Sequence, residues 1–374
     1  MRSFFLLIVV SLFLLSNVAA QSSRSFAFKI TGTINADSGT IRLMLIADSN
    51  YYPKEMRNVT AAVVNKRFVL TGSLPYPQGV QLLYNDKYIT DVFVITKGDQ
   101  SVTYDIFSRE LPIIQNEVTK EQEDCIAAFE KVNYTRRMYN QKYDSLRAVY
   151  NNQMPDSTKL HLEEELNAYY RESDRTLLDY VMKHPDSYVA FWKFIRLLPF
   201  GYENIFDSIY ANFSPSLRNT YAGRELSKNL TIAGKLNIGK SFPAISCSDI
   251  QYRKFTANAF SKNKYTLVDF WYSYCEPCRA QFGDLKDLFE EYKDKGFGII
   301  GISTDKVKDE KNWVNTINKY QLLWPQYWDK NGKEANRLLI TAFPTNFLID
   351  REGRIVQKNL RPIELKEFLR TNLE

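Results

Sequence analysis

Two cysteines lie three positions apart in the stretch Cys275-Glu276-Pro277-Cys278. An apolar run typical of a strand precedes them and an amphipathic stretch typical of a helix follows, so Cys275 falls at a predicted helix start. A thiol there faces backbone N–H groups that have no intrahelical acceptor, together with the positive end of the helix dipole. Both stabilise the thiolate, which is the nucleophilic form. The spacing puts Cys278 on the first turn, within disulfide reach, and predicts a redox-active pair. Cys275 precedes the helix and is expected to be the more exposed of the two, whereas packing should shield Cys278.

Two other uses of such a pair are a zinc half-site and a structural disulfide. Pro277 suits the first helical turn, where the backbone N–H has no intrahelical partner. Zinc would need two further ligands at matching spacing, and the sequence has none. The only histidines are His161 and His184, which makes a His-based metal site or a Ser–His–Asp triad hard to build. We therefore expect redox chemistry, with no metal and no cofactor.

The other two cysteines are expected to be buried and inert. Cys125 falls on an apolar stripe of helical spacing, and Cys247 shares strand phase with Ile245. A regulatory disulfide between Cys247 and the redox pair has no support in the sequence. His161 lies beside a run of glutamates that is typical of a solvated helix face.

The elements around the pair alternate between strand and helix. Strands are predicted at 265–271, 297–303, 346–349 and 354–357, and helices at 275–294, 311–320 and from Pro362 onward. Asp350-Arg351-Glu352-Gly353 is typical of a hairpin turn between the last two strands. A β-α-β run followed by a β-hairpin and a helix indicates an α/β sheet of mixed direction.

The chain before this region divides into two parts. Alternating apolar residues such as Phe26, Phe28 and Ile30, with frequent turn signals, predict a small β-sandwich domain. Asn65-Lys66 lies between two apolar runs and is expected to turn a hairpin. Beyond about residue 115 the apolar spacing becomes helical. We predict a signal peptide at 1–20, a β-rich domain at 21–115, a helical region at 116–236 and the α/β domain at 237–374.

Composition narrows the possible partners. The chain has 374 residues, with 49 basic and 43 acidic side chains and a formal net charge of +6. No basic run stands out, so nucleic acid is not an expected partner.

The N-terminus is typical of a signal peptide cleaved near Ala20, because it carries Arg2, an apolar run from Phe4 to Leu15 and small residues before Gln21. An uncleaved anchor is the alternative. We expect a periplasmic protein.

Several motifs together resemble the thioredoxin-fold, extracytoplasmic TlpA/ResA-type thiol–disulfide oxidoreductases. They are 268–271 (VDFW), 275–278 (CEPC), 301–305 (GISTD) and 343–350 (FPTNFLID), followed by Gly353. The resemblance covers roughly the last 135 residues and rests on the combination of motifs. The β-rich and helical parts resemble, more loosely, the N-terminal extensions of many such proteins in Bacteroidetes-type bacteria.

The resemblance implies a role for each matching residue. Cys275 would attack, Cys278 would resolve, and Pro344, after Phe343, would be a cis-proline beside the disulfide. Asp269 matches a buried acid behind the thiols, whose raised pKa would let it take the resolving thiol's proton; a purely structural Asp269 is the alternative. Trp271 is expected beneath the active-site helix, where its role is either structural or functional.

The sequence also departs from the family pattern. ResA-type proteins place an acid three residues after the second cysteine, and here that position is Gln281. Glu276 disfavours a thiolate and Arg279 favours one. The dipeptide Glu276-Pro277 lacks the histidine of strongly oxidising relatives, which favours a reductase with a potential nearer about −270 mV than about −120 mV.

The predicted function is therefore reduction or exchange of disulfides in exported proteins. Its partners would be protein thiol or disulfide substrates and an upstream membrane or periplasmic electron donor. A thiol peroxidase is disfavoured because Tyr272 occupies the position, three residues before Cys275, where a peroxidase would carry Thr. A client-binding or partner-binding module with secondary redox activity remains a further alternative.

Overall fold

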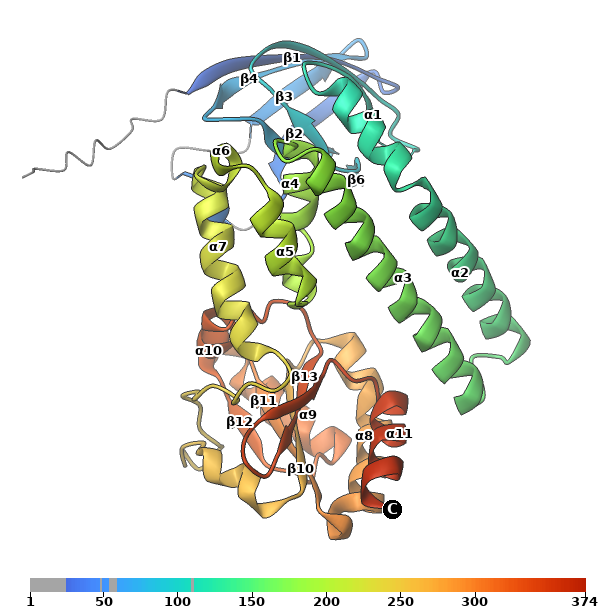
Figure 1. The fold of residues 1–374 in the computed structure, drawn as a ribbon, viewed down its shortest axis with the longest axis vertical. Helices are drawn as coiled ribbons and strands as arrows, with labels where there is room; N and C mark the ends of the chain where they lie inside the picture. Colours follow the sequence, from blue (N-terminus) through green and yellow to red (C-terminus); the bar gives the residue numbers. More distant parts are fainter. Residues whose placement is uncertain (1–24, 48, 54–58, 109–110) are drawn as a thin grey trace, which may run out of the picture.

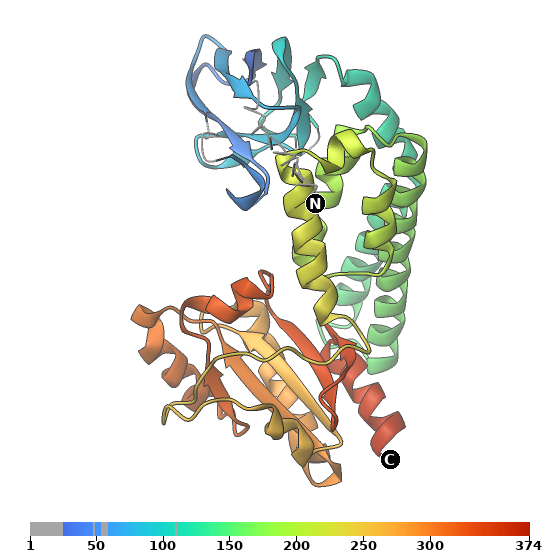
Figure 2. The ribbon, with the colours of Figure 1, turned by 60° about the vertical axis from the view of Figure 1, so that its left-hand side comes forward.

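The computed structural model describes residues 25–47, 49–53, 59–108 and 111–374. The predicted signal peptide and its cleavage site lie outside these ranges. A β-rich domain, a helical segment and an α/β domain follow one another along the chain (Figure 1). Figure 2 shows the β-rich and α/β domains at opposite ends of the helical segment, which α7 (Tyr221–Ala233) spans along its length.

The N-terminal domain confirms the β-rich prediction. Within the described ranges, nine strands form one hydrogen-bonded sheet in the order β6-β5-β2-β3-β4-β1-β8-β9, with β7 pairing to β5. The alternation in β1 buries Phe28 and Ile30 but leaves Phe26 exposed at the strand start. The predicted turn at Asn65-Lys66 joins β3 to β4, and both residues have positive φ, as a two-residue hairpin turn requires. The strands are β1 (Phe26–Ile34), β2 (Ser38–Leu45), β3 (Val59–Val64), β4 (Arg67–Leu74), β5 (Gln78–Tyr84), β6 (Tyr88–Ile89), β7 (Phe93–Ile95), β8 (Gly98–Tyr104) and β9 (Ile113–Gln115).

The helical segment begins at α1 (Thr119–Ala128) and ends with α7. Its core is aromatic and is centred on Phe191, Trp192 and Phe194 of α4 (Tyr188–Ile195). Cys125 is buried in this core, as predicted. The apolar stripe that carries Cys125 continues into α2 (Glu130–Val149), where Val132 is buried but Tyr143 and the C-cap residue Tyr150 are exposed. The remaining helices are α3 (Asp156–Lys183), α5 (Ile205–Asn212) and α6 (Pro215–Arg218).

The C-terminal domain has a five-stranded sheet of mixed direction, in the order β12-β11-β10-β13-β14. Strands β10, β11 and β12 are parallel, whereas β13 runs antiparallel to β10 and β14 antiparallel to β13. The elements are β10 (Tyr265–Trp271), α8 (Glu276–Tyr292), β11 (Phe297–Ser303), α9 (Glu310–Tyr320), β12 (Gln326–Trp328), α10 (Lys333–Arg337), β13 (Thr345–Asp350), β14 (Ile355–Lys358) and α11 (Pro362–Leu373).

Two cores cover the two faces of this sheet. Helices α8, α9 and α11 contribute to one core, which contains Leu267 and Trp271 of β10. The opposite core contains Val268 and Phe270 together with residues of segment 236–260, among them the buried Cys247, as predicted. Because successive strand residues point to opposite faces, Asp269 shares the face of Leu267 and Trp271 and lies on the α8 side.

The segment that leads into the C-terminal domain runs along its outer strand β14. The N–H of Gly239 donates to the carbonyl of Ile355 at 2.7 Å, and the N–H of Ile355 donates to Lys240 at 2.8 Å. The N–H of Phe242 donates to the carbonyl of Gly353 at 2.8 Å. The chain is therefore hydrogen-bonded to the domain's edge as soon as it leaves the helical segment.

Polar contacts also join α11 to α3. Lys366 pairs with Asp156 at 2.9 Å, and Asn167 donates to Glu364 at 3.2 Å.

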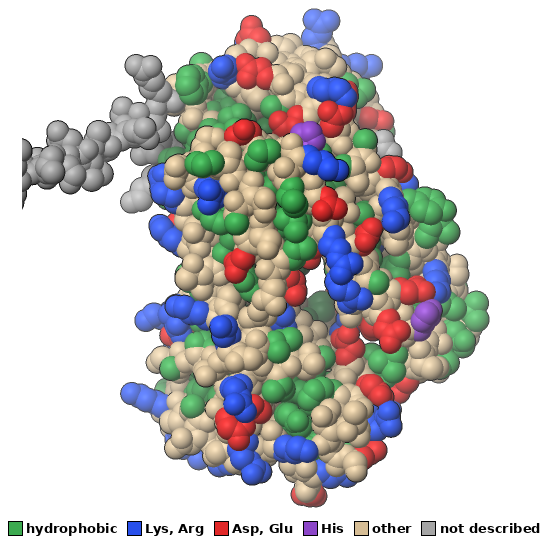
Figure 3. All heavy atoms as spheres, viewed as in Figure 1, with side chains coloured by type: hydrophobic (Ala, Val, Ile, Leu, Met, Phe, Trp, Pro, Cys, Tyr) green, Lys and Arg blue, Asp and Glu red, His purple; other side chains and the backbone are tan. Residues whose placement is uncertain are grey.

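On the face of the molecule in Figure 3, Lys and Arg side chains are interspersed with Asp and Glu. No helix in the described part of the chain is long and apolar enough to cross a membrane.

Candidate active site

The redox pair lies where β10 passes into α8. Cys275 and Cys278 form a disulfide with their Cα atoms 5.3 Å apart. Cys275 is the N-cap residue of α8 and has an extended backbone. Its Sγ accepts the N–H of Cys278 at 3.2 Å. The helix end thus directs a free backbone donor at the first sulfur, which is the arrangement that favours a thiolate at this position.

The exposure of the two sulfurs differs from expectation. We expected Cys275 to be the more exposed residue, yet Cys275 and Cys278 are each only 1% exposed. Both belong to the core on the α8 side of the sheet. Exposure in the oxidised form therefore does not indicate which thiol attacks a substrate. The position of Cys275 as the N-cap of α8 is what distinguishes the two.

The other residues of the motif surround the pair. Glu276 and Pro277 occupy the first turn of α8 and are exposed. The Phe343–Pro344 peptide bond is cis, as the resemblance implied. Phe343 packs edge-on against Tyr272 with ring centroids 5.4 Å apart. These rings place the proline loop beside the strand end that leads to Cys275.

Trp271 lies beneath the active-site helix, as expected. Its ring packs edge-on against Phe282 of α8 at 5.3 Å, and its indole N–H donates to the side-chain oxygen of Gln326 at 3.2 Å. Trp271 is 1% exposed. It fixes the height of α8 over the sheet and so the position of the disulfide.

Asp269 is buried on the same face of the sheet as the redox pair. It is 3% exposed, and no donor within the described ranges reaches its Oδ1 atom. Burial raises the pKa of Asp269 to about 7 because desolvation disfavours its charged form. A carboxyl group with this pKa is able to exchange a proton near neutral pH, which is the property the predicted role requires.

A second buried acid was not predicted to take part. Asp305, 4% exposed, lies two residues beyond β11. Its carboxyl oxygens accept the N–H of Ser273 at 2.9 and 3.1 Å and the hydroxyl of Ser273 at 2.6 Å. The hydroxyl of Ser303 donates to Oδ2 at 2.7 Å. The sequence signals were an acid directly after a buried strand and a Ser between aromatic residues beside the cysteines.

The remaining candidates lie elsewhere or have no role in the site. Gln281 is half-buried on α8, and Cys247 lies in the core on the opposite face of the sheet. Burial raises the pKa of the Cys247 thiol to about 12 and that of Cys125 to about 11, which makes both poor nucleophiles. Among the residues described, no group of three His, Cys, Asp or Glu side chains is placed to hold a metal ion.

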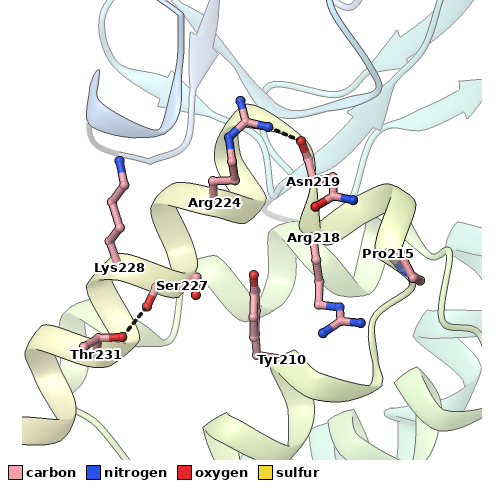
Figure 4. A pocket seen from close by; sticks show the side chains of 8 residues that line it. All are labelled: Tyr210, Pro215, Arg218, Asn219, Arg224, Ser227, Lys228 and Thr231. Carbon is pink, nitrogen blue, oxygen red and sulfur yellow. Dashed lines mark hydrogen bonds between the residues drawn. The ribbon is translucent and has the colours of Figure 1, made fainter. Parts of the chain in front are cut away.

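A separate hollow of about 420 Å³ lies between α5, α6 and α7 (Figure 4). Arg218, Arg224 and Lys228 line it, but their charged ends point in different directions in Figure 4. Arg224 donates to the backbone oxygen of Asn219, and Lys228 pairs with Glu225 at 3.0 Å. The cations do not converge, so this hollow has no arrangement suited to an anion.

The sheet order, the disulfide at the head of α8 and the cis-proline together define a thioredoxin-like domain. A family model described as AhpC/TSA family matches residues 238–358. Over 140 residues the chain is 30% identical to the thiol-disulfide oxidoreductase ResA of Bacillus thuringiensis, a match that spans 37% of this chain and 79% of that protein. A ResA of Bacillus cereus is 32% identical over 124 residues, which span 33% of this chain and 70% of that one.

Solved structures are also similar over the same region. One of them is the thioredoxin domain of a thiol-disulfide oxidoreductase from Bacteroides vulgatus, 34% identical, with a TM-score of 0.34, and the match covers 37% of this chain and 99% of that one. Through its C-terminal domain, the chain belongs to the ResA family of thiol–disulfide oxidoreductases.

Proposed function

We propose that this protein reduces or exchanges disulfide bonds in exported proteins through Cys275 and Cys278. The observation that carries the proposal is the capping geometry, in which Sγ of Cys275 accepts the N–H of Cys278 at the start of α8. After reduction the same donor and the helix dipole favour the thiolate of Cys275. Cys275 is therefore assigned as the attacking thiol.

The reaction proceeds in two exchanges. The Cys275 thiolate attacks one sulfur of the client disulfide, forms a mixed disulfide, and releases the other client sulfur as a thiolate, which takes up a proton. Cys278 then gives its proton to the Asp269 carboxylate and attacks Sγ of Cys275. The second client thiolate leaves, and the Cys275–Cys278 disulfide forms again. Two electrons pass to the client, and an upstream dithiol donor of the membrane or periplasm restores them.

The second exchange is intramolecular, because both sulfurs belong to the same helix start. Their Cα atoms are 5.3 Å apart in the disulfide, so Cys278 attacks the mixed disulfide at high effective concentration. A pKa of about 7 lets Asp269 accept a proton near neutral pH and give it up afterwards. An extended client would bind along the loop of Phe343 and Pro344, and the packing of Phe343 on Tyr272 supports this placement.

The thiol assignment is tested by trapping. In the full mature chain, Cys278→Ser keeps the attacking thiol and should accumulate mixed disulfides with clients, seen as bands that reductant abolishes. Cys275→Ser is the matched control and should trap nothing and reduce no insulin. Better trapping by Cys275→Ser would reverse the two roles. Insulin reduction by wild type at the level of the Cys275→Ser variant would overturn the proposed activity.

Export is the second part of the proposal. Arg2, the apolar run at 4–15 and the small residues before Gln21 support a cleaved signal peptide. The mature protein recovered from the periplasm should begin at or near Gln21 in N-terminal sequencing. Recovery of an intact N-terminus in the soluble cytoplasmic fraction would contradict it.

A further inference from the structure

We propose that Asp305 is a positioning residue of the redox site, which acts through Ser273 to hold the Cys275 sulfur on the N-terminus of α8. The inference rests on the proposed function, since it assigns a residue that prepares Cys275 for attack. Asp305 touches neither cysteine in the hydrogen bonds of the site, so its effect must pass through the chain between them.

That chain is a tight turn. The N–H of Cys275 donates to the carbonyl of Tyr272 at 2.9 Å and closes a four-residue turn. Ser273 is the second residue of this turn, and both its N–H and its hydroxyl donate to the carboxyl group of Asp305. Asp305 therefore anchors the turn from its buried side through Ser273, which lies two positions before the attacking sulfur. On the exposed side of the turn, the hydroxyl of Tyr274 accepts a hydrogen bond from Asn312.

The anchor is itself fixed. The backbone oxygen of Asp305 accepts the indole N–H of Trp328 at 2.8 Å and the N–H of Asn331 at 3.1 Å. The preceding residue, Thr304, donates its N–H to the carbonyl of Trp271 at 2.8 Å. The ends of β10 and β11 are thus joined directly before the turn, and the backbone of Asp305 is held by bonds that do not involve Ser273.

This rigidity matters for the thiolate. The N–H of Cys278 stabilises charge on the Cys275 sulfur only while the donor and the sulfur stay aligned, and they are 3.2 Å apart. A turn free to move would spend time out of alignment, and the pKa of the Cys275 thiol would rise. In this network the carboxyl group of Asp305 accepts three donors and donates no bond. Its negative charge alone would also raise the thiol pKa.

Positioning and charge make opposite predictions for Asp305→Asn. If Asp305 positions the turn, the amide disrupts the anchor and the pKa of Cys275 rises. If Asp305 acts only as a charge, removing the charge lowers that pKa. Ser273→Ala removes the hydroxyl that donates to Asp305 and leaves the Asp305 carboxyl group in place. Ser273→Thr keeps a hydroxyl at this position and is the conservative variant. Ser303→Ala is the matched control, because Ser303 donates to the same carboxyl group from outside the turn.

The experiment measures iodoacetamide alkylation of the fully reduced mature chain between pH 4 and 9, with peptide mass spectrometry to identify Cys275. Circular dichroism checks that each variant is folded. Ser273→Ala and Asp305→Asn should raise the apparent pKa of Cys275. A pKa that is higher by about 1 leaves about one tenth as much thiolate at pH 6, so alkylation at this pH slows about tenfold. Ser273→Thr and Ser303→Ala should stay within about twofold of wild type.

Three results would overturn the inference. They are unchanged profiles for Ser273→Ala and Asp305→Asn, faster alkylation in Asp305→Asn, or an equal change in Ser303→Ala. Failure of the proposed function has a different signature, in which wild-type Cys275 is not the first thiol alkylated at low pH. If Ser273→Ala fails to fold, Asp305→Asn still decides the sign, with Ser303→Ala as its control.

Discussion

Two buried acids lie on neighbouring strands of the C-terminal sheet and meet opposite surroundings. Asp269, within β10, has an oxygen that no donor in the described ranges reaches, and burial raises its pKa to about 7. Asp305, just beyond β11, accepts three donors from Ser273 and Ser303. An acid without partners is suited to carry a proton, whereas a satisfied acid is suited to hold a backbone in place. The site contains one of each.

The largest effect is expected for Asp305→Ala. It leaves the N–H and hydroxyl of Ser273 and the hydroxyl of Ser303 without their acceptor. Each lost bond costs about 1 to 1.5 kcal/mol, so the free energy of unfolding should fall by about 3 to 5 kcal/mol. Urea denaturation of the oxidised full chain measures this. A loss below about 1 kcal/mol would show that water replaces the network.

Asp269→Asn should raise the free energy of unfolding above about pH 7, whereas Asp305→Ala should lower it. The folded-state pKa of Asp269 is raised from 3.8 to about 7, so the folded protein binds the proton more tightly than the unfolded chain does. Wild-type stability should therefore fall as pH rises from about 4 to about 7, by up to about 4 kcal/mol for a pKa difference of about three. The variant should lose this fall and be more stable than wild type at pH 8.

The control for this experiment is Asp174→Asn in helix α3. Desolvation and the nearby Glu203 raise the pKa of Asp174 to about 6. The substitution should remove only the share of the fall in stability between about pH 4 and 6 that Asp174 contributes, because Asp269 still titrates in this variant, and it should not change insulin reduction. A pH dependence of stability that is the same in Asp269→Asn and wild type would show that Asp269 stays charged in the folded protein.

Asp269→Asn should also slow the resolving step while leaving attack unchanged. The amide cannot take the proton of Cys278, so mixed disulfide should persist on the order of a hundredfold longer at pH 7, at the lower end of general-base effects. Rapid quench of a labelled disulfide peptide measures both steps. Equal slowing of attack and resolution would indicate that Asp269 shapes the site and does not carry a proton.

The smallest effect is expected for Ser303→Ala. It removes one of the donors to Asp305, and the two donors from Ser273 remain, so the loss of stability should be about 1 kcal/mol. Urea denaturation beside Asp305→Ala gives the comparison. A loss as large as that of Asp305→Ala would mean that the network fails as a unit.

The sequence predicts the long elements of the C-terminal domain and misses the short ones. Strands β10 and β11 have the predicted limits, because each is a short, mostly apolar run that is nearly all buried, although Asp269 interrupts the run in β10. Helix α8 begins one residue after Cys275, where the motif indicated. The three-residue strand β12 and the five-residue helix α10 were not predicted, because periodicity cannot be recognised over so few residues.

The site was predicted as far as its residues are neighbours in sequence or share a motif. Cys275, Cys278, Asp269 and Pro344 belong to recognisable motifs. The bond between Ser273 and Asp305 joins residues 32 positions apart, and it depends on how the ends of β10 and β11 align. The near-complete burial of Cys275 was missed for the same reason, since it comes from three-dimensional packing around the disulfide.

The hydrogen bonds between segment 239–242 and strand β14 set how the C-terminal domain can be excised. In the sheet order, β14 is an outer strand, and the incoming segment covers part of its open side. A fragment that starts after Phe242 would present a bare strand edge, the kind of surface on which chains add to one another and aggregate. A fragment that starts before Asn237 keeps its own cover. The same hydrogen bonds restrain the segment that links the helical segment to the C-terminal domain. A rotation of this domain away from the helical segment would first have to break them.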